Sequence, residues 1–244
     1  IKGGTVNNST STSGEAVTLW ARQGEIVVTG GTFINKSNKE ATVYAGTSAD
    51  GSAPAITIKG GTFENKATGP YEYKNSLKPL TLNVQNDKPV TSIVITGGTF
   101  YGNDPKNGDD NLGGTFLAEG YKAVENGDGT WVVRKKENNA QVGGKNYEEL
   151  SDAIEASNSI DTITLTKNTT VKLENGVANE NEKSRNITIK GDGTQTVDVI
   201  TRAISAEGGM LNYQRGSTFA FENVTVQAGE GNFDGIVCDE LTYK

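Results

Sequence analysis

The sequence predicts an all-β fold: a parallel β-helix (β-solenoid) in two consecutive blocks, with one short capping helix at the start of the second. The first observation is a recurring phrase that runs from β-branched residues through Gly-Gly to Thr-Phe, at Ile26–Phe33, Ile56–Phe63 and Ile93–Phe100. A clipped copy opens the chain at Ile1–Val6. The first glycines of the four copies stand at positions 3, 30, 60 and 97, and such self-similarity indicates a repeat architecture.

Each copy is expected to supply one coil of about three short strands. The alternation of Ile56, Thr57 and Ile58 predicts a strand with one apolar face. The two glycines are expected to turn the chain sharply, after which Thr-Phe begins a second strand. A third extended run follows each polar loop, at 16–20, 41–44 and 80–84. Strands of successive coils lie ~4.8 Å apart, so like residues should stack on like.

The predicted stack places Phe33 on Phe63 and Phe63 on Phe100, because these residues end the three complete phrases. A sandwich of antiparallel hairpins is the alternative fold. It would predict Asn-Gly or Asp-Gly turns between neighbouring strands rather than one phrase at a near-regular step. The repeated phrase therefore favours parallel coils.

Composition excludes several classes of function. The chain has 244 residues, a formal net charge of −7 and an isoelectric point near 4.8, with acidic and basic residues interspersed. This pattern argues against nucleic-acid binding, which needs a basic stripe. No stretch approaches the ~20 apolar residues that cross a bilayer, so no membrane insertion is expected. Cys238 is the single cysteine and the chain has no histidine, so a buried structural thiol is favoured over a nucleophile.

The first block is expected to span residues 1–136 and to end in a hairpin cap. Extended runs at 116–124 and 131–133 flank the Gly-rich turn Asn126–Thr130, which is typical of a β-hairpin. Its aromatic residues are expected to cover the open end of the stack, since terminal units of repeat proteins are atypical. These residues are Phe116, Tyr121 and Trp131.

The second block is expected to span residues 137–244, after a charged linker at 134–139. It opens with an amphipathic helix at 147–157, predicted by the stripe Tyr147, Leu150, Ala153, Ile154 and Ser157. Asn146 is the expected helix cap. Strands are expected at 162–165, 170–173 and 186–190, followed by the altered glycine turn 191–194 and a further coil at 219–226.

Four aromatic residues are candidate ligand-binding positions. Trp20 and Tyr44 occupy comparable places on successive third strands, and Tyr71 and Tyr73 lie in a long loop. A row of exposed rings on stacked coils would form a flat platform for sugars. The alternative is that the rings pack between coils, because aromatic side chains bury much area.

Three acidic residues are candidate metal ligands. Asp104, Asp109 and Asp110 share a loop with Asn107 and Asn111, and their oxygens could hold Ca²⁺. The spacing does not match an EF-hand loop, and a solvated loop is the alternative. No other cofactor is indicated.

The recurring Ile-x-Ile-x-Gly-Gly-Thr-Phe coils resemble the right-handed parallel β-helices of the pectate-lyase superfamily, as found in large surface proteins of Gram-positive gut bacteria. The runs Phe116–Tyr121 and Gly129–Val133 look like the close of such a block. The run Ala140–Tyr147 looks like the opening of the next, although relatives commonly carry glycine where this chain has Ile160. The resemblance implies an extracellular, surface-exposed or secreted, adhesin-like bacterial protein, and its motifs specify fold rather than chemistry.

The sequence therefore predicts a non-catalytic scaffold that presents loops to a host glycan or a host protein. Because the chain starts in mid-repeat, a fragment of a longer protein is expected. A polysaccharide-active lyase or glycosidase is one alternative, but polygalacturonase-like sites need histidine, and Gly108–Asp110 echoes such a site only superficially. A host-protein-binding module, for example one that engages an antibody, is the other alternative.

Overall fold

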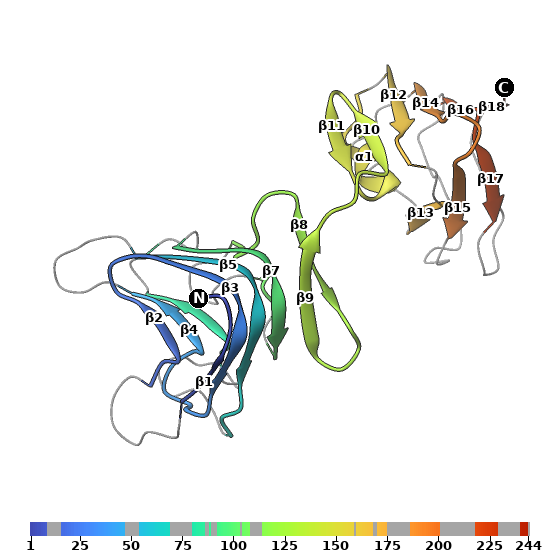
Figure 1. The fold of residues 1–244 in the computed structure, drawn as a ribbon. Coiled ribbons are helices and arrows are strands. Elements are labelled where there is room, and N and C mark those ends of the chain that lie inside the picture. Colours follow the sequence, from blue (N-terminus) through green and yellow to red (C-terminus); the bar gives the residue numbers. More distant parts are fainter. Residues whose placement is uncertain are drawn as a thin grey trace. The chain divides into compact units, whose positions relative to one another are not determined.

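The computed structural model is mostly β, with one short helix among the residues it describes (Figure 1). These are residues 1–8, 16–46, 54–68, 80–85, 88, 92–102, 104–107, 114–158, 160–167, 170–174, 186–200, 218–228 and 240–243. The chain divides into two compact units, Ile1–Lys135 and Lys136–Lys244. The sequence predicts this boundary one residue later, after residue 136.

The first unit contains two sheets whose repeat-bearing strands run parallel. In the larger sheet each copy of the double-glycine phrase lies directly beside the next, with Phe33 opposite Phe63 and Phe63 opposite Phe100. Its parallel strands, in spatial order, are β1 (Thr5–Asn7), β3 (Gly24–Asn35), β5 (Pro54–Asn65) and β7 (Ile93–Tyr101). The smaller sheet holds β2 (Leu19–Ala21), β4 (Val43–Ala45) and β6 (Leu82–Val84).

The double glycine forms a bulge inside one long strand, so the expected turn between two strands is wrong. β3 and β5 continue through it, with a shift in register after Val28. At Gly60, an added Cβ would lie 2.9 Å from the carbonyl oxygen of Thr29, so only glycine allows the strands to approach. Gly61 has φ +109°, which favours glycine for a different reason. Each complete repeat thus supplies one long, bulged strand and one short strand.

The core of the first unit is built from stacked columns. The rings of Phe33 and Phe63 lie 5.0 Å apart at 5°, and those of Phe63 and Phe100 lie 5.1 Å apart at 9°. All three side chains are fully buried. A parallel column of aliphatic side chains is buried beside them, formed by Val28, Ile58 and Ile95. Burying each phenylalanine contributes roughly 1.5–3 kcal/mol.

A β-hairpin ends the parallel run, as the sequence predicts. β8 (Tyr121–Glu125) and β9 (Thr130–Lys135) are antiparallel, and β9 also pairs antiparallel with β7, placing Trp131 opposite Phe100. Phe116 is buried in the core of the unit. Tyr121 and Trp131 pack against that core while remaining partly exposed. The hairpin therefore takes the Gly98–Tyr101 part of this edge of β7, whereas Ile95 still forms a parallel bridge with Leu117.

The second unit repeats the pairing pattern. One sheet carries four parallel strands, with the antiparallel hairpin of β10 (Ala140–Val142) and β11 (Lys145–Tyr147) along its first edge. The four are β12 (Ile160–Leu165), β14 (Asn186–Lys190), β16 (Thr218–Glu222) and β18 (Glu240–Tyr243). The other sheet holds the parallel strands β13 (Thr170–Glu174), β15 (Thr196–Ile200) and β17 (Thr225–Ala228).

The helix is shorter than the sequence predicts. α1 spans Leu150–Ala156, begins after Glu149 and has no side-chain cap. Asn146 does not cap it, because this residue lies in β11 opposite Gln141. Tyr147 also belongs to that strand, so backbone pairing with β10 takes the residues that would have formed the first helical turn. The apolar stripe itself is confirmed: Leu150, Ala153 and Ile154 are buried.

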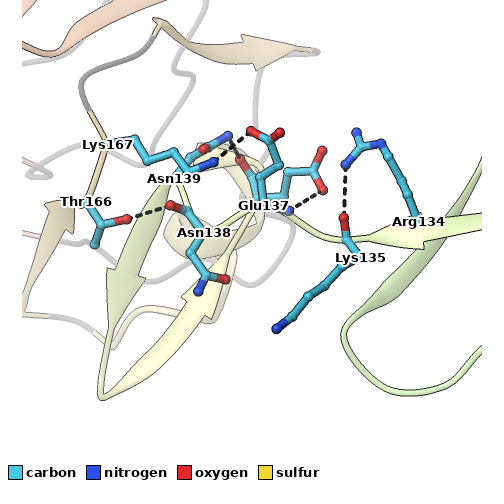
Figure 2. A network of polar contacts seen from close by, with 8 residues as sticks. Arg134, Lys135, Glu137, Asn138, Asn139, Thr166 and Lys167 are labelled. Carbon is cyan, nitrogen blue, oxygen red and sulfur yellow. Dashed lines mark hydrogen bonds and ion pairs between the residues drawn. The ribbon is translucent and has the colours of Figure 1, made fainter. Parts of the chain in front are cut away.

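Of the segment 134–139 expected to be a linker, Arg134 and Lys135 belong to β9, and residues 137–139 are held to the second unit by side-chain and backbone contacts (Figure 2). The Lys167 ammonium lies 3.0 Å from the Glu137 carboxylate, and the Thr166 hydroxyl donates to the Asn138 carbonyl at 2.6 Å. The amide of Asn139 donates to the carbonyl of Glu148 at 2.9 Å. Because the ion pair is exposed, it adds at most about 1 kcal/mol; the hydrogen bonds fix the path.

Candidate functional site

The most suggestive side chains near the short strands of the first unit are Trp20 of β2, Tyr44 of β4 and Arg22, which follows β2; they are called here the Trp20 cluster. Trp20 lies in β2 between Leu19 and Ala21, which are both buried in the core. Strand alternation therefore turns Trp20 to the opposite face. Parallel pairing places Tyr44 of β4 directly beside it. Both rings are half-buried.

The two rings do not form the flat row expected from the sequence. Their centroids lie 5.9 Å apart and their planes are inclined at 64°, an edge-to-face arrangement. The guanidinium carbon of Arg22 lies 4.8 Å from the centre of the Trp20 ring. This cation–π contact is worth about 0.5–1 kcal/mol at an exposed site. The Trp20 cluster therefore brings two inclined rings and one guanidinium group close together and does not form a flat surface.

Trp20 also carries an unsatisfied hydrogen-bond donor. Its indole Nε1 is buried and has no hydrogen-bond partner among the residues that the structure describes. A buried donor without a partner costs roughly 1–3 kcal/mol.

The row of rings ends after two strands. Asn83 follows Tyr44 in register on β6, and it is buried. Its amide donates to the carboxylate of Glu40 at 2.8 Å, and the same oxygen accepts from the backbone N–H of Ala41 at 2.9 Å. Asn83 and Glu40 therefore form a buried hydrogen-bond network beside the Trp20 cluster.

The other candidate residues are not brought to this cluster by the described structure. Tyr71 and Tyr73 lie outside the described residues, as do Asp109 and Asp110. Asp104 is described, and its carboxylate accepts a hydrogen bond from the backbone of Lys106 at 2.9 Å, which closes a local turn. In the described parts of the chain, no group of three or more acidic, cysteine or histidine residues could hold a metal ion.

A pair of asparagines at equivalent positions, Asn35 buried and Asn65 half-buried, is not predicted from the sequence. The side-chain amide of Asn35 donates to the carbonyls of Ala16 at 2.8 Å and Glu40 at 2.9 Å. Asn65, two residues after the next phenylalanine of the repeat, donates to the carbonyl of Leu80 at 3.0 Å. The available signal was the shared spacing Phe-x-Asn in two phrases. These amides tie the long strands to the chain that leads into the short strands.

Two Asp-Gly-Thr turns, one in each unit, share their hydrogen bonds. The carboxylate of Asp128 accepts from the hydroxyl of Thr130 at 2.5 Å and from its backbone N–H at 2.9 Å. Asp192 accepts the same pair from Thr194, at 2.5 and 3.0 Å. The threonine hydroxyl bond is the main cause that lowers the pKa of each aspartate below 3.8. Gly191–Thr194 is thus an aspartate-stabilised turn, unlike the double-glycine bulge.

Among the described residues, no helix is long and apolar enough to cross a membrane. Comparisons of the chain with protein-family models, with curated proteins and with solved structures found no match.

Proposed function

We propose that both units are blocks of a right-handed parallel β-helix and that the chain is a non-catalytic scaffold. In this proposal the scaffold is extracellular, on or secreted from a bacterial cell, and presents its loops and outer face to a host glycan or host protein. The observation that carries it is the in-register parallel pairing of repeated phrases through β1, β3, β5 and β7.

The side chains of the repeats support a mechanical role. The recurring apolar residues of the phrase form the buried phenylalanine and aliphatic columns. The recurring glycine at Gly60 allows neighbouring strands to approach closely. Polar residues that recur, such as Asn35 and Asn65, bond to backbone carbonyls. A stack of this kind gives a stiff, elongated support, since each coil is fixed by its neighbours.

The Trp20 cluster favours a glycan as the ligand. Sugar rings present C–H faces that pack on aromatic rings and hydroxyl oxygens that accept hydrogen bonds. Trp20 and Tyr44 supply the rings, 5.9 Å apart, and Arg22 supplies a charged donor beside them. The unsatisfied Nε1 of Trp20 is buried, so it would become a second donor only after the side chains over it move. This set suits binding and contains no group that would cleave a glycosidic bond.

An array of glycans probed with the whole chain tests the proposal. We expect the chain to bind a subset of the glycans and to leave them chemically unchanged. Trp20→Ala should weaken that binding about tenfold, or by roughly 1.4 kcal/mol. Tyr101→Ala is the matched control, because Tyr101 is an aromatic residue that is 38% exposed and lies outside the cluster. Its binding should equal that of the unchanged protein.

Two results would contradict the proposal. New reducing or unsaturated ends on the arrayed sugars would show a polysaccharide-active enzyme. Capture of an antibody or another host protein from secretions, with no glycan retained and no effect of Trp20→Ala, would replace the glycan with a protein ligand.

A further inference from the structure

We propose that the free edge of β1 is a docking site for one more strand, paired parallel to β1 and carrying the double-glycine phrase. The proposal goes beyond glycan binding and rests only on the sheet of the first unit. Among the described strands, β1 is the first of that sheet and pairs on one side, with β3. An edge strand leaves a row of backbone donors and acceptors open to another chain.

The exposed end of the core is the first support. Val6 occupies the phenylalanine position of its phrase and lies opposite Phe33, yet it is 44% exposed whereas Phe33 is 1% exposed. Ile1 stands two residues before the first glycine, as Val28 does, and is 47% exposed against 0% for Val28. Two core columns therefore end at an open apolar surface, which a further phrase would cover with its own phenylalanine and isoleucine.

Gly3 is the second and independent support. At the first glycine of the three later phrases, an added Cβ would lie 2.5–2.9 Å from a carbonyl oxygen of the preceding phrase, at Gly30, Gly60 and Gly97. Those oxygens belong to Lys2, Thr29 and Lys59. At Gly3 an added Cβ would meet nothing within 4 Å, and the backbone φ lies outside the region that favours glycine. No described residue requires a glycine there, whereas a strand stacked on β1 would.

The occupant that fits is an extended segment with the pattern Ile-x-Ile-x-Gly-Gly-Thr-Phe. Its residue before the glycines would bring a carbonyl against Gly3, as Lys2 does against Gly30. A second copy of this chain fits less well. A two-fold dimer through β1 would pair the edges antiparallel or with opposite faces, so the carbonyl contact at Gly3 would not be repeated. Addition of a strand to a sheet edge is an established mode of peptide recognition.

The test uses a fluorescent peptide with the sequence of residues 93–100, flanked by lysines, titrated into the whole chain. We expect saturable binding that Gly3→Ala weakens about tenfold or more, the effect of losing roughly 1.4 kcal/mol. Gly3→Ala should leave the Tm unchanged, because its Cβ would meet no atom within 4 Å in the described part of the chain. Lys2→Ala, a change at the neighbouring exposed position, is the matched control and should keep peptide binding.

Two altered peptides fix the direction of stacking. Alanine in place of the first glycine of the peptide should not weaken binding, because the outermost strand meets no further carbonyl. Serine in place of the peptide phenylalanine should weaken it, because Val6 would stay uncovered. Equal binding by the unchanged protein and Gly3→Ala overturns the proposal. So does a dimer in sedimentation equilibrium that Gly3→Ala abolishes, which would make a second copy the occupant.

Discussion

The rings of Phe33 and Phe63 are stacked with their centroids 5.0 Å apart and their planes 5° apart. Each residue ends the double-glycine phrase of its own repeat, and the two are directly opposite one another in the parallel sheet. The contact therefore joins neighbouring repeats through equivalent residues. It means that the stability of one repeat depends on the presence of the next.

Phe63→Ala tests that dependence. Phe63 is fully buried and stacks on a ring at each side, so its removal should cost about 3–5 kcal/mol in the free energy of unfolding. Both tryptophans of the chain, Trp20 and Trp131, lie in the first unit, so tryptophan fluorescence in urea follows that unit alone. Tyr101→Ala is the control and should change little. If Phe63→Ala lowered the free energy of unfolding by less than about 1 kcal/mol, neighbouring repeats would not stabilise one another through this stack.

Gly60→Ala tests the close approach of successive strands. Its Cβ would lie 2.9 Å from the carbonyl oxygen of Thr29, so the strands must separate, at a cost of about 1–3 kcal/mol. Gly3→Ala makes the same chemical change at the equivalent position of the first phrase, where space is open. The same urea titration should show a lower midpoint for Gly60→Ala only. Equal midpoints for the two variants would contradict the packing described at the bulge.

Asn35→Asp tests the hydrogen bonds of the buried Asn35 side chain through the pH dependence of stability. The new carboxylate would face the carbonyl oxygens of Ala16 and Glu40, so folding should raise its pKa above the usual value of about 4. A raised pKa in the folded state means that stability is retained below the unfolded pKa and lost as the pH rises through the folded one. The variant should therefore approach the unchanged protein near pH 4 and fall below it at pH 7. A pH-independent difference in urea midpoint would rule this geometry out.

Thr130→Val tests the Asp-Gly-Thr turn. The hydroxyl of Thr130 is the main cause that lowers the pKa of Asp128 below 3.8. In the unchanged protein the stabilisation by this turn is therefore present above the ordinary pKa and is lost as the pH falls through the lowered one. An NMR titration of the carboxyl carbon should show the pKa of Asp128 rising towards its ordinary value in the variant. Asp192, whose partner Thr194 is untouched, serves as the internal control.

The parallel register of the first unit was open to prediction, because one phrase recurs with its apolar residues in the same places. The bulge is not predictable, since a double glycine permits either a turn or a continued strand; in the structure β5 continues, and Gly60 lies against the carbonyl of Thr29. The sequence predicts too long a helix, because Tyr147 continues the apolar stripe of α1 although its backbone pairs with β10. β15 was missed, even though Thr196–Ile200 alternates like the strands that were found.

The candidate site was less predictable than the fold. Equivalent positions in the repeat brought Trp20 beside Tyr44, as expected. Their mutual angle of 64° could not be read from spacing, because it depends on side-chain torsions and on what packs around them. The sequence does not predict the contact of Arg22 with Trp20, because Arg22 follows the end of β2 and no repeated pattern marks it.

The central claim is that equivalent residues of successive repeats stack in order, and NMR on a phenylalanine-labelled chain measures this most directly. We predict nuclear Overhauser contacts between the ring protons of Phe33 and Phe63 and between those of Phe63 and Phe100, whose centroids lie 5.0 and 5.1 Å apart. No contact should join Phe33 to Phe100, because the ring of Phe63 lies between them. Absence of the two neighbour contacts, or a direct contact between Phe33 and Phe100, would contradict the stack.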